Sequence, residues 1–499
     1  MSIPQWQTPS GLLGTIQERV EYEKQLVASD SDGDTVTYTV DAGNDADDLT
    51  IDSLSGELSL KVAADYETKE IYSVRLKAWD GQDEALQEVT INIIDTLGKQ
   101  LGQNIFGEDD SDFSGEIIAL NDDGSKIAIA AYRNDDSGNN AGHVRTFELL
   151  NNQWVQYGGD IDGEFSGDES GVRVALNQAG NVLAISSPSS NGGGSFNGSV
   201  RLFELNSNIW QQKGSTINGK NQGDQAGYGL AINDDGSIVA IGAHRYSTDR
   251  GMVSIYEFNQ GSWSQLGSDI LGEGVNDESG WSVSLSSDGK VLAIGSPGNS
   301  DGTTRGAMGH VRVFEYVSNS WTQKGEDIDG TNTGDEFGFS VSISGDGNSL
   351  AIGAPNYDYF NQQNAGRVEI YQWDSLDGWI GPWGDVIYGD TTNDRYGYSV
   401  QLSSDAKILG VGGIGSNNEG VHEYFEKIFN EGSTRYFNMV SFEEIKGDNT
   451  NPDKILDRRA NISQDGKILA ISYPENSESG TNKGKVSVFQ IGGIDTETN

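Results

Sequence analysis

The sequence contains no cysteine, only eight prolines and only four histidines among its 499 residues. Without cysteine the chain has no disulfide, no thiolate metal site and no thiol nucleophile, so its fold must be stabilised by packing. No apolar run approaches the ~20 residues that a membrane-spanning helix needs. The opening residues, MSIPQWQTPSGLLG, lack the basic and apolar segments of a signal peptide. We therefore expect no signal peptide and no membrane insertion.

Basic residues are also scarce. Lys and Arg total 32 against 76 Asp and Glu, which gives a formal net charge of −44. Such a charge repels nucleic-acid backbones and anionic membranes, so neither is expected as a partner. It favours cations, and it equally favours simple solubility of a chain with many exposed loops. The charge alone leaves both interpretations open.

What the sequence has in abundance is glycine, with 67 residues, and from about residue 98 to 492 it has a repeat. A short alternating run recurs roughly every 50–60 residues. The seven copies are EIIAL (116–120), VRVAL (172–176), YGLAI (228–232), WSVSL (281–285), FSVSI (339–343), YSVQL (398–402) and RRANI (458–462). Self-similarity at this period, with short strands and Gly-rich turns, is typical of β-propellers. We therefore predict an all-β fold with a seven-bladed propeller over residues 97–493 and a tail at 494–499.

Each alternating run leads into a tight turn, most often Asp-Gly as at Asp346 and Gly347, and then into a strand of small residues such as AIGA (351–354). Asp-Gly between alternating runs is a strong hairpin signal. Gly and Ala allow close approach of backbones. We expect these small-residue strands to be the innermost strands of the propeller.

The last repeat lacks its fourth strand, and the segment before the first repeat can supply it. In LGKQLGQNIFG, Gln100, Gly102, Ile105 and Gly107 match Gln323, Gly325, Ile328 and Gly330, where a fourth strand leads out of its repeat. We predict that residues 98–105 pair beside 485–491 and close the ring. Such an exchange leaves no unpaired sheet edge at the joint.

The pattern Phe337, Gly338, Gly353, Ala354 and Pro355 resembles FG-GAP repeats, the units of the integrin α-chain propeller and of many bacterial surface proteins. This resemblance implies a propeller with a surface or adhesive role. In that family several blades carry an Asp-x-Asp-x-Asp-Gly calcium loop, and the corresponding loops here lack that spacing.

One acidic residue recurs four residues before the alternating strands. Its copies are Asp112, Asp168, Asp224, Asp277, Asp335 and Asp394. A short acidic side chain at such a place caps a turn by accepting backbone N–H groups. The alternative is a ring of carboxylates that binds cations or a polyhydroxy ligand.

Residues 12–96, after a short segment at 1–11, form a separate region of alternating strands at 35–40, 57–61, 72–79 and 88–94. A domain of this size and pattern is a small β-sandwich. VASDSDGDTVTYTV, ADYE and YSVRLKAWDG resemble the cadherin-like domain. The resemblance implies calcium held by carboxylates at the two poles, and Ca²⁺ prefers such oxygen ligands. Asp30, Asp32 and Asp80 would lie at one pole, and Glu18, Asp65, Glu67 and Asp95 at the other. The other interpretation is that these acids form and cap turns.

The opening segment PQWQTPSGLLGTIQERVEY also resembles the start of Ig-like modules in structural proteins of marine tailed phages. The matching residues are Trp6, Thr8, Pro9, Leu13, Gly14, Thr15, Ile16 and Glu18.

Aromatic residues offer candidate ligand contacts. Trp154, Trp210, Trp263, Trp321 and Trp379 share a repeat position, so we expect them to pack between blades. Trp281, Trp373 and Trp383 fall outside that position, and these three are the predicted ligand-binding residues.

The sequence shows no nucleophile elbow, zinc motif or phosphate loop, and with 76 acidic residues a catalytic pair can always be imagined. We therefore predict a non-enzymatic structural or adhesion protein. The first hypothesis is a phage virion component, associated with the tail or fibre, whose propeller binds a neighbouring protein or a host glycan. The second is a secreted or cell-surface bacterial adhesin that binds calcium. The third is a glycoside hydrolase. The predicted location is a virion or the cell exterior.

Overall fold

The computed structural model describes residues 2–8, 10–17, 22–43, 45–61, 71–94, 100–190, 196–300, 307–382, 386–389, 391–413, 421–430, 433–437, 460–474, 476–477 and 479–490. The chain divides into two compact units, Met1–Lys99 and Gln100–Asn499. Both units consist of strands and loops. The only helical segment in the described ranges is the single turn α1 (Tyr246–Asp249). The predicted all-β class is therefore confirmed. A search of the described helices finds none with the length and apolar character needed to cross a membrane.

The first unit contains two main sheets that enclose one core. The larger sheet has the order β2 (Gly11–Gln17), β9 (Glu84–Ile94), β8 (Ile71–Trp79), β5 (Thr37–Ala42). The smaller has the order β3 (Glu23–Gln25), β7 (Glu57–Leu60), β6 (Leu49–Ile51), and β1 (Gln5–Trp6) pairs with β4 (Ala28–Ser29). Alternate residues of β8 are buried, as the period-two pattern predicts. Leu58 and Leu76, from different sheets, are fully buried in the shared core.

The second unit contains seven antiparallel sheets in its described part. Five of them have the same plan, in which four strands follow one another in chain order and a fifth, two-residue strand pairs with the start of the third. The first two of these sheets contain β11 (Ile117–Leu120), β12 (Lys126–Ala131), β13 (His143–Leu150), β14 (Gln153–Gln156) and β15 (Ile161–Asp162), and then β16 (Arg173–Leu176), β17 (Val182–Ser187), β18 (Ser199–Asn206), β19 (Ile209–Gln212) and β20 (Ile217–Asn218). The third and fourth contain β21 (Gly229–Ile232), β22 (Ile238–Gly242), β23 (Met252–Asn259), β24 (Ser262–Gln265) and β25 (Ile270–Leu271), and then β26 (Ser282–Leu285), β27 (Val291–Ser296), β28 (His310–Val317), β29 (Ser320–Gln323) and β30 (Ile328–Asp329). The fifth contains β31 (Ser340–Ile343), β32 (Ser349–Ala354), β33 (Arg367–Asp374), β34 (Gly378–Ile380) and β35 (Ile387–Tyr388).

The remaining two sheets lack part of this plan in the described residues. One contains β36 (Ser399–Leu402), β37 (Ile408–Gly413), β38 (Val421–Asn430) and β39 (Ser433–Phe437). The other contains β40 (Ala460–Ile462), β41 (Ile468–Tyr473), β42 (Lys485–Gln490) and, beside β42, β10 (Ile105–Phe106) from the start of the unit.

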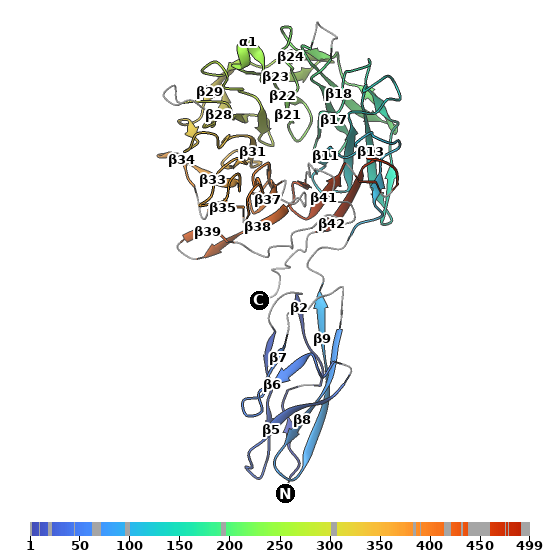
Figure 1. Cartoon of the computed structure of the whole chain (residues 1–499), viewed down its shortest axis with the longest axis vertical. Helices are drawn as coiled ribbons and strands as arrows, with labels where there is room; N and C mark the ends of the chain where they lie inside the picture. Colours follow the sequence, from blue (N-terminus) through green and yellow to red (C-terminus); the bar gives the residue numbers. More distant parts are fainter. Residues whose placement is uncertain are drawn as a thin grey trace. The chain divides into compact units, whose positions relative to one another are not determined.

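The seven sheets follow one another around a common centre (Figure 1). The first strand of each sheet contacts the first strand of the next, from β11 through β16, β21, β26, β31 and β36 to β40, and β40 contacts β11. Apolar side chains fill the layers between neighbouring sheets. One such layer joins Ile129 and Phe147 of the first sheet to Ile468 and Val488 of the last.

The position of the small-residue strands differs from the prediction. They are the second strands of their sheets, and the alternating strands are innermost. Glycine in the second strand is nevertheless explained by close approach. A Cβ on Gly295 would come within 3.0 Å of the Gly338 carbonyl of the next sheet, and one on Gly353 would meet Gly397 in the same way. The small residues are therefore needed where each second strand passes beneath the loop that enters the neighbouring sheet.

The predicted pairing of the segment before the first repeat with the last strand is present. Ile105 pairs with Val486, and Gln100 forms a bridge with Phe489. The Leu101 N–H donates to the Val488 carbonyl at 2.8 Å. Ile105 is buried between the first and last sheets. Residues 98 and 99 lie outside the described ranges.

The repeat-position tryptophans pack between sheets, as predicted. The Trp154 indole donates to the Leu101 carbonyl at 2.7 Å, and that of Trp321 donates to Leu266 at 2.8 Å. Each acceptor belongs to the preceding repeat. The ring lies against a glycine there, Gly102 for Trp154, so a larger residue would collide with the indole. This contact links each outer strand to the sheet before it.

Candidate functional site

Four aromatic side chains from four consecutive repeats form an arc, which we call the aromatic arc. They are Tyr228, Trp281, Phe339 and Tyr398, and each directly precedes the first strand of its sheet. The ring centroids of successive members are 4.7, 5.4 and 4.9 Å apart. All four are partly exposed. In the first two repeats the same position holds Glu116 and Val172.

The backbone explains why these side chains meet. Each follows a glycine with a positive φ, such as Gly280 at +88° and Gly338 at +88°, a conformation that favours glycine. The glycine carbonyl approaches the second strand of the preceding sheet too closely for a side chain there. The residue after each glycine is therefore held close to the residue at the equivalent position of the next repeat.

A histidine and an arginine flank the arc. The His244 ring lies 4.2 Å from that of Tyr228 and 5.2 Å from that of Trp281. The Arg173 guanidinium lies 4.8 Å above the Tyr228 ring. Burial, followed by the charges of Arg245 and Arg173, lowers the pKa of His244 to about 3. His244 is therefore neutral at physiological pH, and Arg173 supplies the positive charge beside the arc.

The arc borders a pocket of about 220 Å³. Besides the four rings and Arg173, it is lined by backbone and side chains at the start of the first strands, among them Ser282, Ser340 and Ser399. The Ser282 and Ser340 hydroxyls donate to the carbonyls of Gly338 and Gly397, which leaves their oxygens as acceptors. Aromatic faces with a few fixed polar groups are typical of small-ligand sites. The described lining residues include no Asp or Glu.

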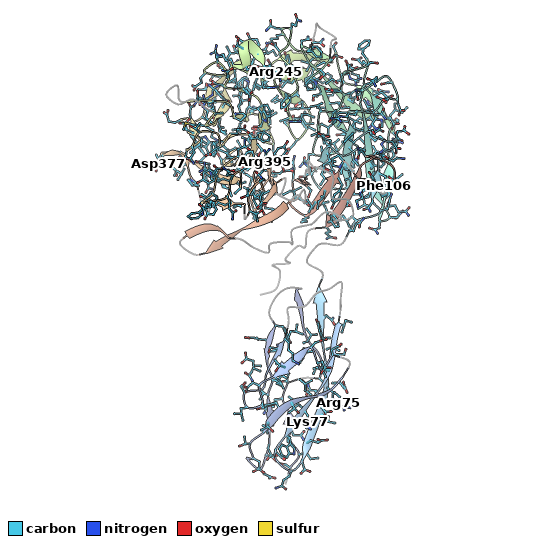
Figure 2. The ribbon with its side chains drawn as sticks, in the orientation of Figure 1. Arg75, Lys77, Phe106, Arg245, Asp377 and Arg395 are labelled. Atoms are coloured by element: carbon cyan, nitrogen blue, oxygen red, sulfur yellow. The ribbon has the colours of Figure 1, made fainter. Side chains whose placement is uncertain are left out.

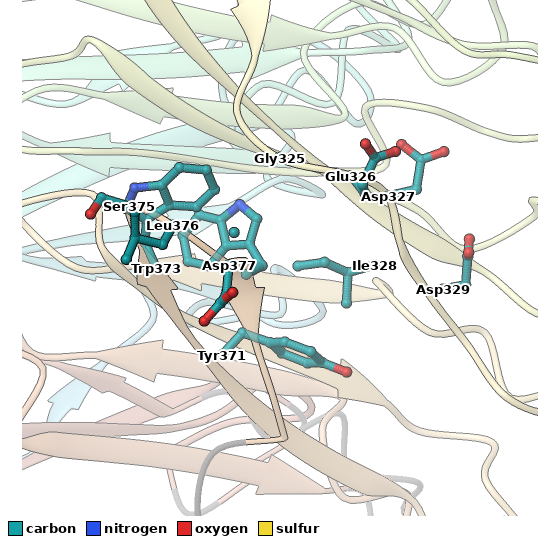
Figure 3. A pocket seen from close by; sticks show the side chains of 12 residues that line it. Gly325, Glu326, Asp327, Ile328, Asp329, Tyr371, Trp373, Ser375, Leu376 and Asp377 are labelled. Atoms are coloured by element: carbon teal, nitrogen blue, oxygen red, sulfur yellow. The ribbon is translucent and has the colours of Figure 1, made fainter.

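Trp373 lies in a second pocket at the outer edge of the ring, of about 500 Å³ (Figure 3). Its ring is 5.5 Å from that of Trp379, edge to face, and the Lys324 ammonium lies 5.0 Å from the Trp373 ring. The acidic side chains of this pocket are Glu326, Asp327, Asp329 and Asp377. The structure thus places two of the three predicted tryptophans in pockets, but in different ones. Trp383 lies outside the described residues.

The recurring aspartates cap turns, as expected. The Asp168 carboxylate accepts the Phe165 N–H at 3.0 Å, and Asp224 accepts the Asn221 N–H at 2.7 Å. Asp112 does the same for Asp109, Asp277 for Gly274 and Asp394 for Thr391. Each is almost fully buried, and burial raises the pKa of Asp168 and Asp224. These carboxylates therefore do not form an exposed binding ring.

The structure describes only one of the two groups of acidic residues that are predicted to bind calcium in the first unit. Asp30 accepts the Asp32 N–H at 2.8 Å, and Asp80 accepts the N–H groups of Gln82 and Asp83, each at 2.7 Å. These are bonds of turn-forming acids. The basic side chains of β8, Arg75 and Lys77 (Figure 2), pair with Asp41, which is not one of the predicted calcium ligands. Glu18, Asp65, Glu67 and Asp95 lie outside the described residues, so the second pole stays a prediction.

Comparison with known proteins gives one family match. The model described as "FG-GAP repeat" matches residues 328–371, the segment from β30 to β33. No curated protein matches the sequence. Solved structures with similar folds include a periplasmic gluconolactonase from Pseudomonas aeruginosa, at 11% identity and a TM-score of 0.44, covering 81% of this chain and 96% of that one.

Two further structures are the propeller domain of the Trilobed protease from Pyrococcus furiosus, at 9% identity and a TM-score of 0.42, and Drosophila N-cadherin EC1-3, at 22% and 0.18. The first comparison covers 80% of this chain and 97% of the other, and the second covers 19% and 34%. Similarities at this level support no shared activity.

The ring of sheets and the FG-GAP match together define the second unit as a β-propeller. Sequence reasoning selected Trp281 but missed Tyr228, Phe339, Tyr398 and Arg173. The signal was available. The first letters of YGLAI, WSVSL, FSVSI and YSVQL are all aromatic, so the arc is visible once the repeats are aligned.

Proposed function

We propose that this chain is a non-enzymatic structural or adhesion protein whose propeller binds a saccharide unit of a host-surface glycan in the pocket of the aromatic arc. One observation carries the proposal, the arrangement of four partly exposed rings with Arg173 around a pocket of about 220 Å³. That volume lies below the ~300–1,000 Å³ of sites for drug-sized ligands, so it suits one sugar ring. Aromatic faces cover the apolar face of such a ring, and Arg173 with the serine oxygens hydrogen-bonds its hydroxyls.

The architecture that we propose is a small cadherin-like sandwich followed by seven blades, closed by residues 98–105 in the last one. The pairing of Ile105 with Val486 and the core shared between the first and last sheets support this closure. In this arrangement the pocket lies near the inner ends of the blades. The outer strands remain for contacts with a neighbouring protein of the assembly.

We propose a phage virion, at the tail or fibre, as the setting. The resemblance of the opening segment, including Trp6 and Thr8, to modules of phage structural proteins favours it. A calcium-binding adhesin on a bacterial surface is the second candidate, favoured by the acidic residues at the turns of the first unit. A glycoside hydrolase needs two carboxylates beside the ligand, and none lines this pocket among the described residues.

The test is binding of the full chain to a glycan array, followed by titration of the best ligand. We expect Trp281→Ala or Tyr398→Ala to weaken binding by roughly 10- to 100-fold, because each removes a stacking face at the centre of the site. Trp373→Ala, in the outer pocket, is the matched control and should leave affinity unchanged. Equal melting temperatures would show that the variants fold.

The proposal is wrong if the variants of the aromatic arc bind as tightly as the wild-type chain while Trp373→Ala binds more weakly. That result would place the site at the outer edge of the ring. Release of reducing sugar during the titration would favour the hydrolase. Detection of the protein in purified phage particles, or only on bacterial cells, separates the two settings.

A further inference from the structure

Two buried histidines of the propeller face carboxylates in the same way at two different repeats. His143 opens β13 and His310 opens β28. The groups around them are Glu108 and Asp160 in the first case, and Glu273 and Asp327 in the second. In each group the ligand atoms lie within 4.8 Å of one another. Neither set takes part in the aromatic arc.

Each histidine has at least one buried nitrogen without a hydrogen-bond partner. His143 is 0% exposed, and neither its Nδ1 nor its Nε2 makes a hydrogen bond. His310 is 1% exposed, and its Nε2 is unpaired. A buried polar atom without a partner costs about 1–3 kcal/mol. Neutral imidazole is the form that coordinates metals.

In both groups an arginine faces one carboxylate oxygen of the glutamate, and the other carboxylate oxygen faces the histidine. The Arg145 guanidinium pairs with Oε1 of Glu108 at 3.3 Å, while Oε2 faces Nδ1 of His143 at 3.9 Å. In the other repeat, Arg312 faces Oε1 of Glu273 at 3.8 Å, and Oε2 faces Nδ1 of His310 at 4.0 Å. The same division of the two oxygens occurs twice. Arg145 and Arg312 are therefore positioning residues that turn a carboxylate oxygen toward the imidazole.

The equivalent positions of other repeats show that this place accepts a cation. In the third repeat, Lys220 replaces the glutamate, and its ammonium lies 2.6 Å from Asp269, the counterpart of Asp160 and Asp327. In the fifth repeat, Arg367 replaces the histidine and donates to Thr331 at 3.1 Å. The second repeat has Glu164, Ser199 and Thr216 at these positions, so histidine with two carboxylates is a feature of the first and fourth repeats.

We propose that Glu108, His143 and Asp160, and separately Glu273, His310 and Asp327, are two binding sites for a divalent transition-metal ion of the Zn²⁺ class. One imidazole nitrogen and two carboxylate oxygens neutralise the ion and suit zinc better than calcium, which prefers oxygen ligands alone. Zinc ligands at ~2.0–2.1 Å lie about 3.3 Å from one another in a tetrahedron. Partly exposed Glu108 and Glu273 can rotate to close the distance, with water at the fourth place. A pocket of about 600 Å³ beside His310 and Glu273 gives the second site an entry path.

The experiment is a Co²⁺ titration of the full chain, with visible absorption as the readout, in physiological salt and millimolar Ca²⁺ to occupy oxygen-only sites. We expect two Co²⁺ equivalents with tetrahedral absorption, both displaced by Zn²⁺. His143→Gln and His310→Gln should each remove one equivalent, and the double variant should remove both. His244→Phe changes a buried histidine that no carboxylate of the described residues faces, and it should retain both.

A second pair of variants covers the case in which a histidine substitution disturbs folding. Glu108→Gln and Glu273→Gln lie at the partly exposed rim and should weaken Zn²⁺ binding at their own site by ~10-fold or more. Two results would overturn the proposal. One is a wild-type chain that shows no tetrahedral Co²⁺ absorption. The other is an unchanged spectrum and affinity in the folded double histidine variant or in the glutamate variants.

Discussion

At the scale of single residues, burial decides the chemistry of the ionisable groups near the axis of the propeller. His244 is 2% exposed, and its Nδ1 makes no hydrogen bond. Its neutral ring packs against Tyr228 and Trp281 as an aromatic residue would. Arg173 remains charged at the rim of the same pocket. Binding in the pocket therefore depends on ring faces and on one permanent cation.

The lowered pKa of His244 makes a prediction about stability and pH. The unfolded chain takes up a proton near pH 6.5, whereas folded His244 does so only near pH 3, so falling pH favours the unfolded state in this window. We expect His244→Phe to gain about 2–3 kcal/mol relative to wild type between pH 7 and pH 4.5. Urea unfolding of both proteins at the two pH values measures this change. A difference that does not vary with pH would show that His244 has the same pKa in the folded protein as in the unfolded chain.

At the scale of strands, the propeller depends on contacts that only a glycine or a correctly placed strand allows. Second strands pass so near the next sheet that Gly242, Gly295 and Gly353 have no room for a side chain. Tryptophans of the outer strands lie against glycines of the preceding repeat. Both contacts join neighbouring sheets, so a change in either acts on the interface between blades.

Gly295→Ala tests the closeness of this packing. Its Cβ would collide with the Gly338 carbonyl, which is backbone and cannot rotate away. We expect a loss of about 2–4 kcal/mol in unfolding free energy, in the range of overpacked cores. Gly159→Ala, at a glycine with open space around its Cβ position, is the control and should change stability by less than ~0.5 kcal/mol. Equal effects in both variants would contradict the close approach.

The closing segment has its own test. Ile105 and Ile270 occupy the same repeat position, and both are buried. If the segment at 98–105 closes the ring as predicted, Ile105→Ala should cost as much as Ile270→Ala, about 2–4 kcal/mol. Denaturant unfolding of the two variants gives the comparison. A cost near zero for Ile105→Ala alone would mean that the segment does not close the ring.

At the scale of the whole molecule, the net charge of −44 is the dominant property. Like charges repel one another in the compact state, and salt screens this repulsion. The same charge raises the local concentration of cations, which favours both the predicted calcium sites of the first unit and the proposed metal sites of the propeller.

We expect the melting temperature to rise by about 2–4 °C between 10 and 200 mM NaCl, as follows from roughly 1 kcal/mol of relieved repulsion. Differential scanning fluorimetry measures the shift. Potassium glutamate serves as a second salt, to separate screening from specific chloride effects. A melting temperature that falls with salt would show that attractive ion pairs outweigh the repulsion.

Local sequence patterns were enough to predict the repeat, the strand order within each repeat, the pairing of the opening segment with the last strand and the capping role of the recurring aspartates. These features depend on period-two patterning, turn chemistry and residue size, which are local. Sequence reasoning also placed the repeat tryptophans between sheets. It misjudged the small-residue strands, because closeness to the axis and closeness to the neighbouring sheet both require small side chains.

Which residues come together as sites depends on the folded ring of sheets. The aromatic arc joins one residue from each of four repeats, and each proposed metal group joins the first residue of a third strand to acidic residues of two different loops. His143 and His310 share a repeat position, so the sequence presented them as scaffold. Their chemistry depends on burial and on carboxylates that the ring brings beside them. Distance in space across the repeats, rather than spacing along the chain, determines what these side chains can bind.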